Sequence, residues 1–314
     1  MSRLSICIVF LLLVFLSIAQ ASEGDDSPEF QACVEHCVQD ECPNKVLPIY
    51  LRLTLWSCPD DCRYNCMHEI TARNDTVVQY YGKWPFYRFF GIQEPASVLF
   101  SMGNLCMHYH YLRIMQREIP DSNMMRPYSL GYAIVNLNTW ISSSVFHSRD
   151  LPRTEKLDYF GAALTIMYSL YYAVLRVFGL AGTRNAAILG ATGIVLYFCH
   201  ICYMALVSFD YVYNMVACGV VAVIQGSLWV LWYIMYRRQL PYAKWVLWST
   251  IANAMAAALE IFDFPPLWLV FDAHSLWHFS TIFVAPLWYR FVLEDAKHTD
   301  GYSILPSEQH AISV

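Results

Sequence analysis

Residues 211–236 read YVYNMVACGVVAVIQGSLWVLWYIMY, and this stretch decides the fold class because it contains no Asp, Glu, Lys or Arg. A helix needs about 20 consecutive apolar residues to cross the hydrocarbon core of a bilayer. The length and composition of the stretch therefore predict a transmembrane helix.

Six further runs without Asp, Glu, Lys or Arg flank it, at residues 95–112, 128–146, 159–175, 186–209, 245–259 and 273–289. Most approach or exceed the spanning length, and the shorter ones can extend over flanking aromatic residues. The runs at 186–209 and 211–236 are separated mainly by Asp210, so their turn must be tight. We expect an all-α polytopic membrane protein whose seven transmembrane helices form a bundle.

The composition of the 314 residues agrees with a membrane protein. Apolar residues make up 57% and charged residues 14%, whereas soluble domains carry about 25% charged residues. A soluble enzyme, a disordered chain and a fibrous repeat are therefore excluded. With 20 basic against 25 acidic residues, nucleic acid is not expected as a partner.

The N-terminus has the pattern of a secretory signal peptide. Arg3 precedes an uncharged, strongly apolar run, and Ala19-Gln20-Ala21 supplies an A-x-A cleavage site. We predict a signal peptide at residues 1–21, with a signal anchor as the alternative. Either one delivers the chain from Glu23 onward to the lumen.

Residues 22–94 are predicted to form a small lumenal domain rich in disulfides. An even number of cysteines in an oxidising compartment implies a disulfide framework. Three residues separate Cys33 from Cys37, and the same spacing recurs from Cys58 to Cys62 and Cys66. This helical spacing indicates two short helices that are stapled together by disulfides. A zinc site is the weaker alternative. The segment is acidic, with a net charge of −6 between Ser22 and Pro95. Six of the eleven cysteines lie here: Cys33, Cys37, Cys42, Cys58, Cys62 and Cys66.

Glycosylation and loop charges predict the orientation. Asn74-Asp75-Thr76 is a glycosylation sequon, which requires a lumenal position. If residue 23 onward starts in the lumen, ten basic residues fall in the cytoplasmic loops and tail and three in the lumenal loops, as the positive-inside rule demands. We assign residues 95–293 to the transmembrane domain and 294–314 to a cytoplasmic tail.

Residues capable of chemistry gather at three of the predicted helix ends. Ser143 and His147 lie four residues apart at the end of the second span, and Asp158 opens the third. His274 and His278 open the seventh with the same spacing of four. This spacing places each pair on one helical face, and the predicted orientation puts all three ends at the lumenal leaflet.

Three histidines that leave one position open are the ligand set of a catalytic zinc. We therefore predict that His147, His274 and His278 bind Zn²⁺, which makes hydroxide available from water near neutral pH. Asp158 would orient that water and take its proton. Ser143 would hold the water or donate a hydrogen bond to the developing oxyanion.

Simpler interpretations exist for each part. Two histidines on one apolar helix can form interhelical hydrogen bonds, and His147 can cap a helix. Asp158 can be a carboxylate favoured by a helix N-terminus. Glu260 and Asp263, near the lumenal end of the sixth span, are either partners of the site or ordinary interfacial residues.

The pattern of Ser-x3-His, an Asp eleven residues later and a late His-x3-His resembles the CREST superfamily of seven-helix membrane hydrolases and receptors. Within it, the chain resembles the family of post-GPI attachment to proteins factor three, which is GPI-specific phospholipase A2-like. The resemblance covers essentially the whole chain after the signal peptide. The strings that carry it are GKWPF at 82–86, QEPAS at 93–97, VFHSRD at 145–150, TEKLDYF at 154–160, FDY at 209–211, DFPP at 263–266, DAH at 272–274 and WH at 277–278.

The resemblance implies a zinc-dependent acyl-ester hydrolase that remodels GPI anchors by removing the unsaturated sn-2 chain of their inositol phospholipid, which leaves lyso-GPI for reacylation. The implied partners are GPI-anchored proteins and membrane lipids, and the implied location is the Golgi membrane, or alternatively the endoplasmic reticulum. The family's zinc residues map onto His147, His274 and His278, and its Ser and Asp onto Ser143 and Asp158. A non-catalytic receptor or a lipid-trafficking factor with structural zinc is the competing interpretation, and ceramidase-type amide hydrolysis lacks support from the lumenal domain.

Overall fold

A computed structural model of the chain describes residues 23–74, 76–261 and 263–304, and the predicted signal peptide at residues 1–21 lies outside them. In these ranges the regular structure is helical, with isolated β-bridges besides. The chain divides into two compact units. Unit 1 holds residues up to Val98 with His147–Asp150 and Ala258–Trp277, and unit 2 holds Leu99–Phe146, Leu151–Ala257 and residues from His278 onward.

The N-terminal part of unit 1 is built on helices α2 (Pro28–Asp40), α3 (Ile49–Leu53) and α4 (Cys58–Arg73). Ser27 caps α2 by accepting a hydrogen bond from the N–H of Phe30 at 3.2 Å. Ser57 caps α4 in a capping box with Asp60. Such caps supply partners to N–H groups that have none inside the helix.

Three disulfides join the parts of this segment, as the cysteine pattern predicts. Two of them connect α2 with α4, which confirms the expected pair of stapled helices. Because all six cysteines are paired, the alternative of a zinc site formed by thiolates is wrong. The bonds are Cys33–Cys66, Cys37–Cys62 and Cys42–Cys58.

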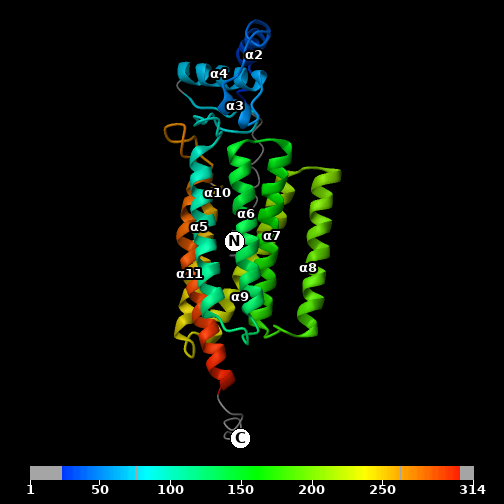
Figure 1. The fold of residues 1–314 in the computed structure, drawn as a ribbon, viewed down its shortest axis with the longest axis vertical. Coiled ribbons are helices and arrows are strands. Elements are labelled where there is room, and N and C mark those ends of the chain that lie inside the picture. The colour runs from blue at the N-terminus through cyan, green and yellow to red at the C-terminus, as the bar shows by residue number, and fades with distance from the viewer. Residues whose placement is uncertain (1–22, 75, 262, 305–314) are drawn as a thin grey trace, which may run out of the picture. The chain divides into compact units, whose positions relative to one another are not determined.

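Each of the seven predicted apolar runs lies on a helix. The long helices run roughly along one direction (Figure 1). The run at 186–209 covers most of α8 and continues through a π-helical turn, η1 (Tyr203–Val207). Separately, a 3-10 turn, η2 (Pro241–Ala243), precedes α10. The bounds are α5 Pro95–Glu118, α6 Arg126–Ser148, α7 Pro152–Val177, α8 Arg184–Cys202, α9 Tyr211–Tyr236, α10 Lys244–Ile261 and α11 Ala273–Ile304.

Three helical segments of the described residues are long and apolar enough to cross a membrane, namely Pro152–Val177, Arg184–Val207 and Tyr211–Tyr236. They indicate a membrane protein. The other four long helices do not meet this criterion, so the count of seven spans stays a prediction. Their hydropathy is lower because they carry polar residues inside the fold, such as Asn104 and His108 on α5, which are 0% and 5% exposed.

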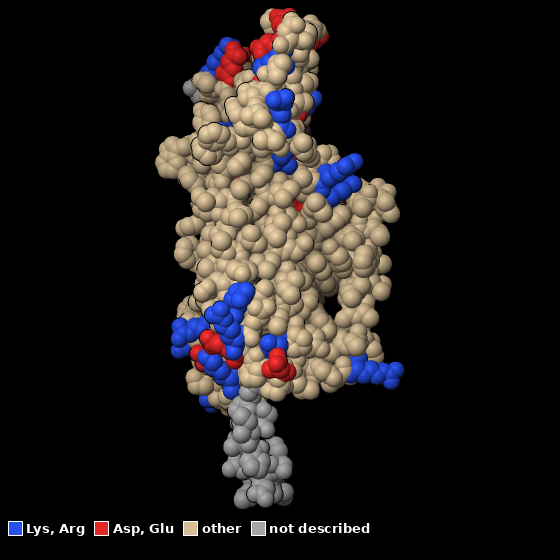
Figure 2. Space-filling view, viewed as in Figure 1, with Lys and Arg blue, Asp and Glu red and all other residues tan. Residues whose placement is uncertain are grey.

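Helices α8 and α9 turn apolar side chains outward. Val195 and Phe198 on α8 and Val223 on α9 are all more than half exposed. Figure 2 shows a broad surface of uncharged residues over the long helices. Exposed apolar surface of this extent is typical of contact with lipid.

The core of unit 2 is rich in aromatic residues. Trp229 lies on α9 and packs against Trp288 and Phe291 of α11, with ring centroids 5.6 and 5.2 Å apart. Next to it, the guanidinium of Arg176 donates two hydrogen bonds of 2.6 Å to the buried carboxylate of Asp295. Helix α11 continues to Ile304, so the segment predicted as a tail from residue 294 begins as helix.

Candidate metal centre

Helix α6 ends just after His147, the first of the three predicted zinc ligands. Its last carbonyl groups accept hydrogen bonds from the chain just before α5. The N–H of Glu94 donates to the carbonyl of His147 and the N–H of Gln93 to that of Ser148, both at 3.0 Å. Terminal carbonyls of a helix lack partners within it. These two hydrogen bonds therefore fix His147 beside the side chain of Glu94.

Helix α11 begins at the site with a reciprocal cap. The carboxylate of Asp272 accepts a hydrogen bond from the N–H of Ser275 at 2.9 Å, and the Ser275 hydroxyl accepts one from the N–H of Asp272 at 3.0 Å. Asp272 therefore fixes the start of the helix. His274 stands in the first turn that this cap defines.

Two carboxylates hold the outer ring nitrogens of the histidines in unit 1. Nδ1 of His147 donates to Glu94 at 2.7 Å, and Nδ1 of His274 donates to Glu260 at 2.6 Å. An ionised carboxylate can only accept a hydrogen bond. These pairs therefore place a proton on each Nδ1, so that the neutral ring presents the lone pair of Nε2 inward, as in histidine–carboxylate pairs at metal sites.

The two inner nitrogens face each other. Nε2 of His147 and Nε2 of His274 are 3.2 Å apart. Two lone pairs at this distance repel each other unless a proton or a metal ion is shared between them. Tetrahedral ligands at 2.0–2.1 Å from zinc stand about 3.3 Å from one another, so the spacing fits two ligands of one metal ion.

His278 follows His274 by one turn of α11, and the three histidines offer ligand atoms that all lie within 4.8 Å of one another. Within unit 2, Nδ1 of His278 makes a hydrogen bond of 2.8 Å with the hydroxyl of Ser101. Three imidazoles with one position left over suit a catalytic zinc. The residues present therefore fit a zinc ion, and the group contains all three of the predicted ligands.

Ser143 lies where the sequence predicts, one turn before His147 on α6, and is buried. Its hydroxyl is 3.1 Å from that of Ser101, which in turn binds His278. Asp158 lies in the second turn of α7, which begins earlier than predicted, at Pro152. It is half-buried and is not one of the three grouped ligands. Its role as a base stays a prediction.

The sequence analysis missed two residues of this site, Glu94 and Ser101. Glu94 is 7% exposed in the structure, and its position directly before the first apolar run is the sequence signal that could have identified it. Ser101 offers no such signal, because serine is common in apolar helices. Glu260 is now assigned as the partner of His274, whereas Asp263 accepts hydrogen bonds from Gln79 and Trp84.

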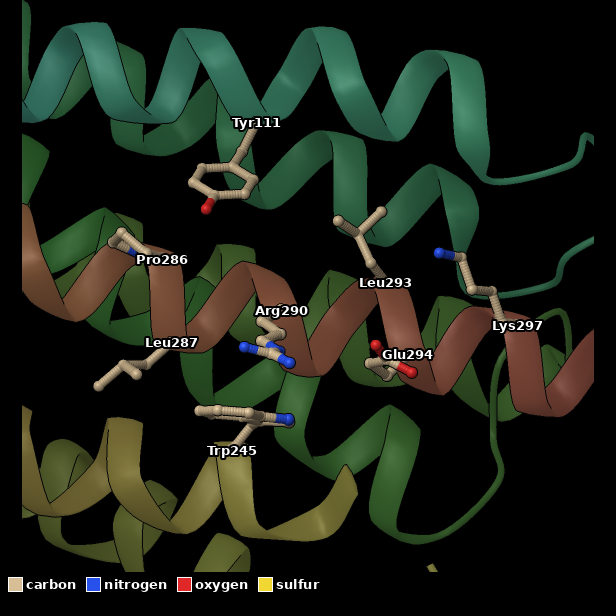
Figure 3. A pocket seen from close by; sticks show the side chains of 8 residues that line it. All are labelled: Tyr111, Trp245, Pro286, Leu287, Arg290, Leu293, Glu294 and Lys297. Atoms are coloured by element: carbon tan, nitrogen blue, oxygen red, sulfur yellow. The ribbon is translucent and has the colours of Figure 1, made fainter. Parts of the chain in front are cut away.

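A separate pocket of about 290 Å³ lies in unit 2 among α5, α10 and α11. Figure 3 shows Arg290 of α11 above the ring of Trp245, with the guanidinium carbon 3.9 Å from the ring centroid. The lining includes Tyr111, Glu294 and Lys297 but no predicted site residue. The histidine group is therefore the stronger candidate for catalysis.

Comparison with known proteins identifies the family of this chain. The sequence pattern of the Per1-like family matches residues 48–296, which is most of the chain. The chain belongs to the Per1-like family. The resemblance noted from the sequence motifs is thereby confirmed.

Relatives from distant organisms match nearly the whole length. "GPI-specific phospholipase A2-like PGAP3" of Xenopus laevis is 39% identical over 305 residues, which cover 92% of this chain and 95% of the relative. The human protein of the same name is 35% identical over 299 residues, 92% of this chain and 93% of its own length. "Protein PER1 homolog" of Schizosaccharomyces pombe is 38% identical over 309 residues, with 92% and 93% covered.

Proposed function

We propose that this protein remodels GPI anchors by zinc-dependent hydrolysis of the sn-2 acyl ester of their inositol phospholipid. The observation that carries the proposal is the approach of Nε2 of His147 and His274 to 3.2 Å, with both Nδ1 atoms held by carboxylates. The names of the relatives supply the substrate class. Water would cleave the ester to give a lysolipid and a free fatty acid.

A zinc ion held by His147, His274 and His278 would supply a Lewis acid and lower the pKa of bound water to about 7. Glu94 and Glu260 hold the imidazoles in the ligating tautomer. Their hydrogen bonds also raise the basicity of the ring. The carboxylates are therefore positioning residues of the proposed site.

The hydroxyl of Ser143, which is 3.1 Å from Ser101 Oγ, would donate a hydrogen bond to the oxygen that gains negative charge as the ester carbonyl is attacked. Asp158 would accept the proton of the attacking water. Burial of His147, His278 and Ser143 keeps bulk water away from these groups and strengthens their electrostatic interactions.

The histidine variants test the proposal directly. His147→Ala and His274→Ala protein, reconstituted in lipid vesicles with a GPI substrate, should release sn-2 fatty acid at least about a hundredfold more slowly than the wild type. His110→Ala is the matched control, because His110 is an exposed histidine on α5 outside the group. Unchanged release by both histidine variants would contradict hydrolysis. Stoichiometric zinc without any turnover would favour the non-catalytic factor.

We further propose that the site faces the lumen of the Golgi, with the endoplasmic reticulum as the alternative. Asn74 supports this orientation because it is exposed at the end of α4, where a glycan has room. Asn74→Gln should lower the apparent molecular mass on a gel by the mass of one N-linked glycan. A glycan that resists endoglycosidase H would indicate passage through the Golgi, whereas complete sensitivity would favour the endoplasmic reticulum.

A further inference from the structure

A second pocket, of about 240 Å³, lies in unit 1 and is not used by the proposed hydrolysis. Aromatic rings form much of its lining, among them Tyr80, Tyr81, Trp84 and Phe86. The ring of Tyr81 is 59% exposed, so its face is accessible to a ligand. Exposed aromatic faces combined with polar groups are suited to the C–H surfaces and hydroxyls of sugars.

The charge of this pocket differs from that of the segment that forms most of it. Residues 22–95 carry a net charge of −6, whereas the pocket is lined by three cations and two anions, a net charge of +1. The cations are Arg63, Lys83 and Arg149, and the anions are Asp60 and Asp150. Arginine and lysine side chains are the usual partners of phosphate.

The charged groups lie close to the accessible ring. Arg63 is half-exposed and bonds to Asp60 at 3.1 Å, and its guanidinium carbon is 5.8 Å from the ring centroid of Tyr81. Asp60 also accepts a hydrogen bond of 2.9 Å from Arg149. One ligand can therefore touch a ring, a cation and a carboxylate at once.

The pocket adjoins the candidate metal centre within unit 1, because one of its lining residues, Lys83, contacts Glu94. Nζ of Lys83 forms an ion pair with Asp150 and lies 3.9 Å from Oε1 of Glu94. The other oxygen of Glu94 binds His147. Gln93 also lines the pocket, and its side chain accepts a hydrogen bond of 3.2 Å from the N–H of Asp150. The carboxylate of Glu94 thus lies between the pocket residue Lys83 and His147.

The local structure holds the pocket in place before any ligand arrives. The capping box of α4 fixes Asp60, and the indole N–H of Trp84 donates to Asp263 at 2.8 Å. The N–H of Tyr81 donates to Asp25 at 2.7 Å. Such prior ordering lowers the entropic cost of binding.

We propose that this pocket binds the phosphorylated glycan of the GPI anchor, and so determines that the hydrolase acts on GPI rather than on other phospholipids. The inference rests on the proposed function, because that function supplies a substrate that joins sugars, phosphate and acyl esters in one molecule. Aromatic faces contact the sugars, Arg63 and Lys83 bind phosphate, and the adjoining histidines receive the ester.

Binding of a headgroup without acyl chains tests the inference. Full-length protein in lipid nanodiscs is titrated by calorimetry with deacylated GPI, and separately with a neutral mannose oligosaccharide and with inorganic phosphate. Deacylated GPI should bind at least about tenfold more tightly than either fragment. Tyr81→Ala and Arg63→Gln should each weaken it about tenfold, whereas Tyr81→Phe, which keeps the ring, should bind like the wild type.

Tyr50→Ala and Arg52→Gln are the matched controls, because both residues are exposed on α3 of the same unit and lie outside the pocket. They should leave the affinity unchanged, and thermal melting should confirm that all variants fold. No binding of deacylated GPI, equal binding of neutral mannose, or wild-type affinity in both pocket variants would overturn the inference. Because no ester is cleaved in this titration, its result is independent of whether the chain is a hydrolase.

Discussion

The N-terminal part of unit 1 and the helices of unit 2 are stabilised by different means. The first has small clusters of buried residues, such as Phe30, Ile70 and Tyr80, and depends on three disulfides and helix caps. The second has a large aromatic core around Trp229 and a buried ion pair. The difference follows from size, because a short segment cannot bury enough apolar surface to remain folded without covalent links.

The largest effect is expected in unit 2, from Asp295→Ala. This change leaves the guanidinium of Arg176 without its carboxylate inside the fold, and breaking a buried pair in this way costs about 3–5 kcal/mol. Thermal unfolding in detergent measures the loss. The double variant Arg176→Met with Asp295→Leu removes both charges and should recover much of it. A single variant as stable as the wild type would show that packing alone holds unit 2.

The next effect is expected in unit 1, from loss of the disulfide that closes its longest loop. Replacing Cys33 and Cys66 by Ala should destabilise this segment by about 2–5 kcal/mol, because the bond spans a sequence separation of 33. Limited proteolysis should then cut residues 23–74 and leave unit 2 intact. Replacing Cys42 and Cys58, with a separation of 16, should have the smaller effect. Cleavage of both units together would contradict their independent stabilisation.

The candidate metal centre allows a subtler comparison, since unit 1 supports its histidines with carboxylates and unit 2 supports His278 with a hydroxyl. Glu94→Gln should lower zinc affinity about 10–100-fold, because the amide holds the His147 ring less firmly. Ser101→Ala removes a weaker hydrogen bond and should have a smaller effect. Zinc content after dialysis against graded chelator measures both. Equal effects would mean that the carboxylate has no special role.

The smallest effect is expected from acid acting on Asp61 of α4. Burial alone would raise the pKa of this carboxyl, but its hydrogen bonds and ion pairs with Arg88 and Lys45 outweigh burial and lower the pKa below the usual 3.8. A lowered pKa stabilises the folded state above pH 3.8, and this contribution is lost as the pH falls through the folded pKa. Unfolding of residues 23–74 should therefore depend less on pH below 4 in Asp61→Asn than in the wild type.

Much of the helical fold could be predicted from the sequence, because its signals are local. Cysteines four residues apart mark one face of a helix, and this correctly placed α2 and α4. The spacing of His274 and His278 likewise depends on one helix alone. Uncharged runs located all seven long helices, but the number that spans a membrane depends on which polar residues, such as Asn104, are enclosed by neighbours. That is a property of packing.

The partners of the histidines were harder to predict because they are distant in sequence. Glu94 precedes His147 by 53 positions and meets it where the chain before α5 forms backbone hydrogen bonds with the end of α6. Glu260 was recognised near its helix end, but nothing local decides between a partner of the site and an interfacial residue. Only the fold selects one of these possibilities.

The pairing of the cysteines has a practical consequence for studying this protein. In the described residues, every cysteine before residue 74 is oxidised, whereas Cys106, Cys199, Cys202 and Cys218 on the long helices keep their thiols, three of them exposed. Once the protein is extracted from lipid, maleimide dyes would therefore attach to the helices and spare the disulfide segment without any engineered mutation. A fluorescent label at Cys106 on α5 would report on the helices while the disulfide segment carries no label.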